Sequence, residues 1–298
     1  EIAELPEAMV LFNGEALDDL RRDGVRWHRY RSSGLVFPTV LAGQFDLVTR
    51  CRCSGMLSFY HQPGYSDVAD QVLATAARIL DVLTEWMGIE PRGNLTLVQL
   101  RRTSFGPYAP SPFVIFTLDD IEVDVEANDW KLISQMLTHE LGHFWFGGML
   151  RSATSEQWLS EGFAQYLNLL YTEHAFGEEA FVAEIRGYLW QLSEVPVADQ
   201  APLADISLAH PAQAILVRLK GAVVLHCLRQ TLGWERFLAF LRTLVQRYRD
   251  RSIDTAIVET VYAEVTTPEE ARTFFDIHLR GKAVYAWSKS THSIRIVD

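Results

Sequence analysis

The sequence predicts an α+β protein, because strand-like segments come first along the chain and helical segments dominate the rest. Residues from about 25 to 62 are expected to form strands. Within them, residues 45–53 alternate apolar and polar side chains, as a half-buried strand does, and residues 55–60 form a second short strand-like run. Continuous apolar runs at 95–100 and 113–117 are typical of buried strands. After residue 129 almost every segment has helical periodicity.

Capping residues and apolar stripes predict the helices. Ser66 can cap a helix whose apolar stripe ends at Gly88, and Asp129 can cap one that runs to about Phe146. Another helix is expected to begin near Trp158. The remaining helices are expected at 180–193, 212–232, 234–248, 255–264 and 268–279, and the last of these opens with a capping box at Thr267 and Glu270.

The change from strands to a mixed and then helical pattern predicts a boundary near residue 62. We therefore expect a β-rich segment at 1–62 and a domain of mixed sheet and helices at 63–298. With 48% apolar and 22% charged residues, the chain can bury a sizeable core.

The charge of the chain bears on its partners. A formal net charge of −11 argues against binding to nucleic acid or to an anionic membrane surface, since both need a basic face. No apolar run approaches the roughly 18 residues of a spanning helix. The sequence does not indicate an oligomeric state.

The three cysteines do not suit a disulfide framework. Cys51 and Cys53 are too close for an unstrained bridge, and an odd count leaves one thiol free. We interpret these two as small, half-buried residues on one face of a strand, although a CxC pair can also bind metal. The cysteine content favours a reducing, cytoplasmic location; the chain begins with Glu1 and not with Met, so a preceding segment is left open.

The motif HELGH carries the strongest chemical signal. His139 and His143 are four residues apart, so a helix presents both imidazoles on one face, about one turn apart. This spacing suits two Nε2 atoms that converge on a tetrahedral Zn2+ at roughly 2.0–2.1 Å. Glu140 stands beside the first histidine, where it can take a proton from a water on the metal. The alternative is a pair of core histidines bonded to the backbone.

The third metal ligand is expected to be Glu161. It follows His143 by 18 positions, within the stretch WLSEG that opens the helix at Trp158. The intervening residues 147–156 are enough to reverse the chain into an antiparallel helix. His139, His143 and Glu161 are therefore the predicted zinc ligands, with Glu140 as the general base.

These motifs resemble those of the aminopeptidase N family of gluzincins. HELGHFWFGG is similar to the family's HELxHxWFGN, WLSEGFAQY to WLNEGFAxY, and LKGAVVLHCLRQTLG to KGAxVLxMLxxxLG. Upstream, FPTVLAGQFDLVTR resembles the end of the family's N-terminal β domain. The resemblance implies a thermolysin-like zinc metallopeptidase catalytic domain, preceded by the end of an all-β N-terminal domain.

Two positions depart from the family pattern. The GxMEN motif, whose Glu binds the α-amine of the substrate, is missing, because residues 106–113 read GPYAPSPF. Asp119 or Asp120 can substitute for it. Where the family has a catalytic Tyr, two positions before the Lys of KGA, this chain has Arg218. An arginine there can stabilise an oxyanion or bind a carboxylate, sulfate or phosphate, or it can be a surface residue without a catalytic part.

The predicted function is a zinc-dependent hydrolase that activates water for attack on the amide carbonyl of a peptide. Catalysis would rest on Glu140 and Arg218. A second hypothesis is a zinc enzyme on the same scaffold that acts on an anionic small molecule or carrier-bound intermediate of specialised metabolism. A third is a pseudopeptidase that keeps zinc for structure, but Glu140 argues against it because a structural site needs no base.

Overall fold

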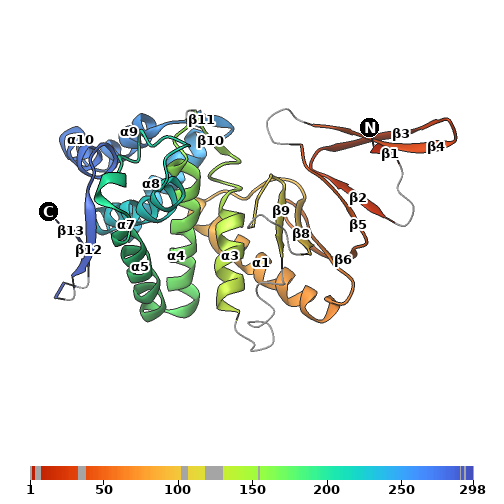
Figure 1. The fold of residues 1–298 in the computed structure, drawn as a ribbon, viewed down its shortest axis with the longest axis horizontal. Helices are drawn as coiled ribbons and strands as arrows, with labels where there is room; N and C mark the ends of the chain where they lie inside the picture. The colour runs from red at the N-terminus through yellow and green to blue at the C-terminus, as the bar shows by residue number, and fades with distance from the viewer. Residues whose placement is uncertain are drawn as a thin grey trace. The chain divides into compact units, whose positions relative to one another are not determined.

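A computed structural model describes residues 2–3, 8–32, 38–101, 107–117, 130–153, 155–288, 290–291 and 293–297 (Figure 1). Contacts divide the chain into two compact units: residues 1–78 with 92–133, and residues 79–91 with 134–298. The boundary expected near residue 62 stays a prediction. Gly106, Asp119, Asp120 and Asp129, which the sequence analysis singled out, lie outside the described residues.

The first unit begins with two small antiparallel sheets. Strands β1 (Ile2–Ala3), β4 (Val25–Arg31) and β3 (Glu15–Arg22) form one, in the order β1-β4-β3, and β2 (Met9–Phe12) pairs with β5 (Val40–Gly43) in the other. The strands before residue 25 were not predicted. In β3 most side chains are exposed and none is buried, so the segment lacks the apolar alternation by which a half-buried strand is detected.

The largest sheet described in the first unit has four strands. Its order is β6-β7-β8-β9, made of β6 (Asp46–Arg52), β7 (Gly55–His61), β8 (Leu95–Leu100) and β9 (Phe113–Thr117). β6 and β7 are a hairpin, whereas β7, β8 and β9 run parallel. Helix α1 (Ser66–Met87) supplies the crossover that a parallel β7–β8 pair requires. These four strands and α1 confirm the predicted segments.

The cysteines differ from the prediction. Cys51 and Cys53 are exposed, not half-buried, and Cys53 lies in the turn after β6. The prediction was wrong because β6 leaves most of its side chains in solvent, so its alternation does not mark a buried face. All three thiols, including that of Cys227, are free.

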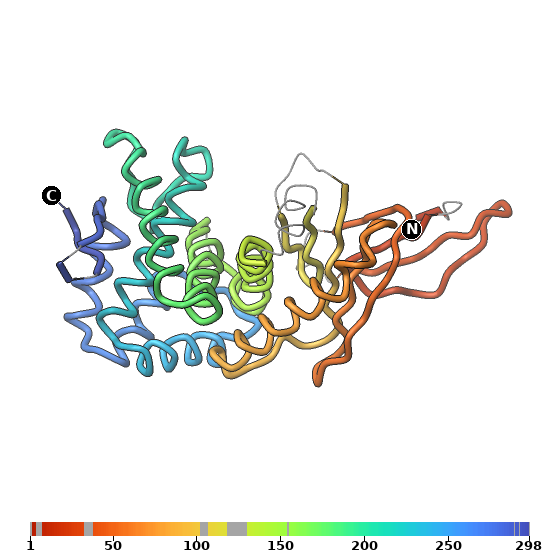
Figure 2. The backbone as a smooth tube through the Cα atoms, turned by 90° about the horizontal axis from the view of Figure 1, so that it is seen from below, coloured from red at the N-terminus to blue at the C-terminus, as the bar shows by residue number. Residues whose placement is uncertain are grey.

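The second unit is mainly helical, as predicted. Helices α4 and α5 run side by side in it (Figures 1 and 2). Its helices, with α3 beginning in the first unit, are α3 (Lys131–Gly142), η1 (Trp158–Gly162), α4 (Phe163–Phe176), α5 (Glu178–Ser193), η2 (Val197–Asp199), α6 (Gln213–Ile215), η3 (Leu216–Lys220), α7 (Gly221–Leu232), α8 (Trp234–Arg247), α9 (Thr255–Val265), α10 (Pro268–Phe275) and η4 (Asp276–Arg280). The Thr267 cap is confirmed, because its hydroxyl accepts from the backbone N–H of Glu270 at 3.2 Å.

Helix α3 ends earlier than expected, at Gly142 and not near Phe146. Beyond Glu140 the backbone hydrogen bonds span three residues and not the four of an α-helix, as in the bond from His143 N to Glu140 O at 3.3 Å. The chain then turns through Gly147, whose φ of +123° a residue with a side chain rarely adopts. His143 therefore stands in the turn that follows the helix, one residue past its end.

Strands were missed in the second unit. β10 (Leu150–Ser152) pairs in parallel with β11 (Arg251–Ile253), and β12 (Val284–Ser288) forms an antiparallel hairpin with β13 (Ser293–Val297). The hairpin lies beside α5 (Figure 1). Among the described residues, no helix combines the length and apolar character that crossing a membrane requires.

Aromatic packing supports the segments around the HELGH turn. Trp145, Trp158 and Phe163 are each no more than 1% exposed, so they are packing residues. The ring of Phe163 stacks on Phe146 with centroids 4.2 Å apart. The indole N–H of Trp158 donates to Thr255 Oγ1 at 3.0 Å, so η1 is joined to α9.

Two glycines let η1 and η3 touch through their backbones. A Cβ on Gly221 would lie 2.9 Å from the Cα of Gly162, a separation that real Cβ atoms essentially never show. Gly162 is the last residue of the π-helical turn η1, and Gly221 directly follows the π-helical turn η3; such turns occur frequently at functional sites. The contact therefore sets the spacing of these two segments.

We predict that Gly221→Ala destabilises the protein by about 1–3 kcal/mol, because the added methyl group forces the two backbones apart. Urea unfolding measures the change. The matched control is Gly187→Ala in α5, where nothing lies within 4 Å of the added Cβ. Since alanine is a better helix former than glycine, the control should be neutral or stabilising by up to about 1 kcal/mol. Equal stability of Gly221→Ala and wild type would contradict the close contact.

Candidate metal centre

Three predicted ligands converge in the second unit. His139 lies near the end of α3, His143 in the turn after it, and Glu161 in η1. His139 Nε2 is 3.4 Å from Glu161 Oε2, and His143 Nε2 is 3.6 Å from Glu161 Oε1. One donor atom from each residue lies within 4.8 Å of the others, so the three could hold a metal ion.

The spacing of these donors fits zinc. A tetrahedral Zn2+ with bonds of about 2.0–2.1 Å separates its ligand atoms by about 3.3–3.4 Å. The separations from the two histidine nitrogens to the two oxygens of Glu161, 3.4 and 3.6 Å, are close to that value. Two imidazoles and one carboxylate are also a donor set that leaves the fourth position of a catalytic zinc open.

A second set of contacts orients His143. Its Nδ1 lies 3.0 Å from Ser160 Oγ and 3.1 Å from the carbonyl oxygen of Phe146. The Ser160 hydroxyl donates to that same carbonyl at 2.9 Å, so it can only accept from the imidazole. Nδ1 therefore carries the proton, and the lone pair of Nε2 faces Glu161. A Cβ on Gly147 would lie 2.8 Å from Ser160 Oγ, which explains the glycine there.

His139 is held differently. It is 5% exposed, and its Nδ1 is buried with no hydrogen-bond partner among the residues that the structure describes. Burial lowers the pKa of His139 to about 4, against the opposing hydrogen bond of Glu161. The imidazole is therefore neutral at pH 7, as a metal ligand must be.

The two glutamates of the site respond to burial in opposite ways. Burial, with the nearby charge of Glu161, raises the pKa of Glu140 to about 8. Burial also disfavours the charge of Glu161, but the hydrogen bond of His139 and the electrostatic influence of the two histidines and Arg218 outweigh it and lower the pKa to about 2. Glu161 is therefore ionised, whereas the ionisation of Glu140 depends on a further positive charge.

Arg218 lies beside this group. It belongs to η3, and its Nε is 3.9 Å from Glu161 Oε2. The side chain is 48% exposed, so the guanidinium reaches the centre from a solvent-accessible side. One of its terminal nitrogens donates to Gln165 Oε1 at 3.1 Å.

Sequence reasoning missed Gln165. It stands one helical turn after Glu161, and its amide N–H donates to the hydroxyl of Tyr188. The four-residue spacing between Glu161 and Gln165 is visible in the sequence. The partners of Gln165, Tyr188 and Arg218, belong to other segments, so the sequence does not reveal them. Tyr166, the next residue along α4, lies in the core with its hydroxyl 3.3 Å from His226 Nδ1.

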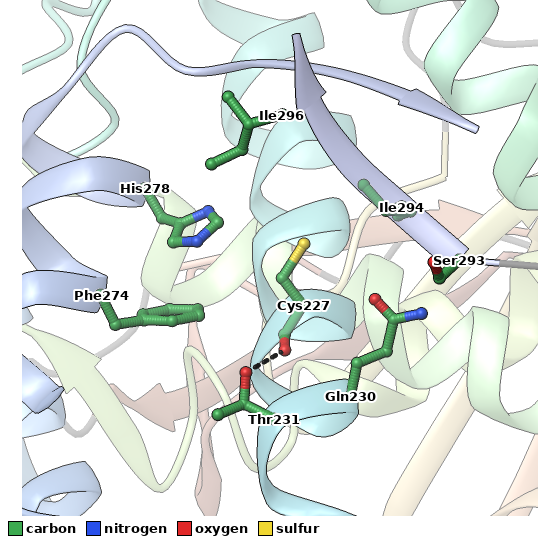
Figure 3. Close-up of a pocket in the computed structure, with 8 residues that line it drawn as sticks. All are labelled: Cys227, Gln230, Thr231, Phe274, His278, Ser293, Ile294 and Ile296. Atoms are coloured by element: carbon green, nitrogen blue, oxygen red, sulfur yellow. Dashed lines mark hydrogen bonds between the residues drawn. The ribbon is translucent and has the colours of Figure 1, made fainter. Parts of the chain in front are cut away.

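A cavity of about 480 Å³ lies elsewhere in this unit (Figure 3). Its lining comes from α7, α10, η4 and β13 and includes Cys227, His278 and Ile296. His139, His143 and Glu161 do not line it. His278 bonds through Nδ1 to the hydroxyl of Tyr285 at 2.8 Å, so it is a buried residue with its hydrogen bond made.

Two solved structures share this fold. A crystal structure of an M1 zinc metallopeptidase from Deinococcus radiodurans superposes with a TM-score of 0.72 at 20% identity, covering 93% of this chain and 61% of the other. A mutant of an M1 zinc metallopeptidase from the same organism, bound to a Tyr-Ser-Ala substrate, gives a TM-score of 0.70 at 20% identity, with 93% and 62% covered. At this identity the likeness shows the fold.

The sequence comparisons identify the family. Aminopeptidase M1 of Arabidopsis thaliana is 23% identical over 236 residues, which are 75% of this chain and 26% of the relative. Glutamyl aminopeptidase of Sus scrofa is 24% identical over 233 residues, 72% of this chain and 24% of the relative. This chain thus spans about a quarter of the length of these relatives. Residues 73–278 match the model of the peptidase family M1 domain, and the chain belongs to that family.

Proposed function

We propose that this chain is a zinc-dependent hydrolase that attacks the amide carbonyl of a peptide. The observation that carries the proposal is the convergence of His139, His143 and Glu161 at zinc-like separations, with the buried Glu140 beside them. Membership of peptidase family M1 supports it, as does the peptide substrate bound to the Deinococcus enzyme.

The metal ligands are His139, His143 and Glu161, and the cofactor is Zn2+. When bound, zinc supplies Lewis acidity, which acidifies a water and polarises a carbonyl. The Ser160 hydroxyl holds the His143 ring in the tautomer that points Nε2 to this position. The negative charge of Glu161 partly balances the ion.

Glu140 is the general base. It is 6% exposed and adjoins His139 in the chain, so its carboxylate is held in a water-poor place next to the ligand group. It accepts a proton from the attacking water and delivers it to the leaving amine. Arg218, 3.9 Å from Glu161, donates to the carbonyl oxygen as that atom gains negative charge.

A second candidate follows from Arg218. Its half-exposed guanidinium is also suited to a carboxylate, sulfate or phosphate on the substrate. This favours an anionic small molecule or carrier-bound intermediate as an alternative substrate. A panel that contains neutral and acidic acyl substrates separates the two candidates. The expected cytoplasmic location stays a prediction.

We predict that Glu140→Gln lowers peptide hydrolysis by about 100-fold or more while zinc stays bound in stoichiometric amount, because only the proton acceptor is lost. Metal analysis and fluorogenic aminoacyl and acyl-peptide substrates measure both properties. Glu179→Gln, at an exposed glutamate of α5, is the control and should keep full activity. Unchanged hydrolysis by Glu140→Gln would refute the assigned base.

Ser160→Ala should weaken zinc binding by about 10-fold or more, because the ring of His143 loses one of its two Nδ1 contacts. Competition with a chromogenic chelator gives the dissociation constant. Ser155→Ala removes an exposed hydroxyl nearby in the chain and should leave the constant unchanged. A zinc affinity of Ser160→Ala equal to that of wild type would show that the contact does not orient the ligand.

Arg218→Met should lower kcat by about 100-fold without loss of zinc, because a donor to the developing oxyanion is removed. The exposed Arg186 of α5 supplies the control, Arg186→Met, which should not affect kcat. Arg218→Tyr tests the position differently. If it hydrolyses the substrate faster than Arg218→Met does, the side chain at position 218 faces the reacting carbonyl. A kcat of Arg218→Met within twofold of wild type would contradict the assigned part of Arg218.

A further inference from the structure

Arg218 is held by a buried amide. Its terminal nitrogen donates to Gln165 Oε1 at 3.1 Å, and Gln165 is only 6% exposed. The bond joins residues 53 positions apart, from η3 to α4. A long, half-exposed side chain is thus attached to a group that packing immobilises.

Tyr188 decides which end of the Gln165 amide faces Arg218. The amide N–H of Gln165 donates to the hydroxyl of Tyr188, which is 4% exposed on α5. Because the N–H end is engaged there, the oxygen end points to the guanidinium. Burial raises the pKa of Tyr188, so its hydroxyl stays neutral and does not form a competing ion pair with Arg218.

The anchor leaves most of the guanidinium available. Of five N–H groups, one goes to Gln165, while the Nε side lies 3.9 Å from Glu161 Oε2. The geometry therefore fixes the orientation of the group at the metal centre without using up its donors. Without the amide, the arginine could rotate into solvent, since nearly half of its side chain is exposed.

We propose that Gln165, with Tyr188 behind it, is a positioning residue that holds the Arg218 guanidinium in place to bind negative charge developing on the substrate. This inference rests on the proposed hydrolase function of the same centre. It adds two residues from α4 and α5 to a site whose other members belong to α3, η1 and η3 and the turn after α3.

A double-mutant cycle tests whether Gln165 acts through Arg218. The proteins are the zinc-loaded wild type, Gln165→Leu, Arg218→Met and the double variant. The probe is a phosphinic dipeptide, whose anionic PO2 group mimics the tetrahedral oxyanion, and calorimetry gives its affinity. Gln165→Leu should weaken binding by about 10-fold in the wild-type background. In the Arg218→Met background it should have less than about a twofold effect.

Conservative variants separate positioning from general damage to the fold. Gln165→Glu keeps an acceptor for Arg218 and should bind the probe within about threefold of wild type. Tyr188→Phe frees the amide to turn and should weaken binding by about threefold. Gln135→Leu is the matched control, because Gln135 is 7% exposed and donates to Thr172, away from Arg218. Zinc content and thermal melting accompany each measurement.

The kinetic signature of Gln165→Leu should be a lower kcat with little change in KM. An equal loss of affinity in both backgrounds would overturn the proposal, as would a wild-type affinity that does not depend on Arg218. Failure of the zinc-loaded wild type to bind the probe would overturn it too. Absent peptide hydrolysis together with an intact binding cycle would instead count against the proposed function alone.

Discussion

The backbone contact between Gly162 and Gly221 is the constraint on which the metal centre depends. Gly162 directly follows Glu161, and Gly221 stands three residues after Arg218. Side chains on either glycine would separate η1 from η3. The contact therefore brings the carboxylate of Glu161 and the guanidinium of Arg218 to 3.9 Å of each other, although the two residues belong to segments far apart in the chain. Aromatic packing around Phe163 then holds η1 against the HELGH turn.

Burial and charge work against each other at this centre. Water is scarce around His139 and Glu140, so burial favours their neutral forms. Glu161 keeps its charge only because His139, His143 and Arg218 surround it. Two glutamates in so small a volume need positive charge, which Zn2+ provides together with Arg218. Burial and the closeness of the two carboxylates thus destabilise this group of side chains without a cation, and the same two features favour the binding of a metal ion.

Membership of peptidase family M1 accounts for the fold. Substrate preference is expected to depend on Arg218, which stands where the family motif predicts a Tyr and which is bonded to Gln165, itself bonded to Tyr188. The side-chain amide of Gln165 uses both of its ends, because its oxygen accepts from Arg218 and its N–H donates to Tyr188. The Arg218 guanidinium is therefore held in one orientation. Acidic and neutral substrates should therefore differ in how they depend on Arg218.

The sequence by itself determined the features that depend on local spacing: the HELGH pair with Glu140, the Thr267 cap, and the strands and helices with strong apolar periods. The position of Glu161 after HELGH also indicated the third ligand, and the family motifs supported it. Only the tertiary structure decided that α3 ends at Gly142, that β12 and β13 form a hairpin, and that Arg218 meets Gln165. Such features depend on contacts between distant segments and on which faces are buried. The hydrophobic periodicity of a single segment contains no information on either.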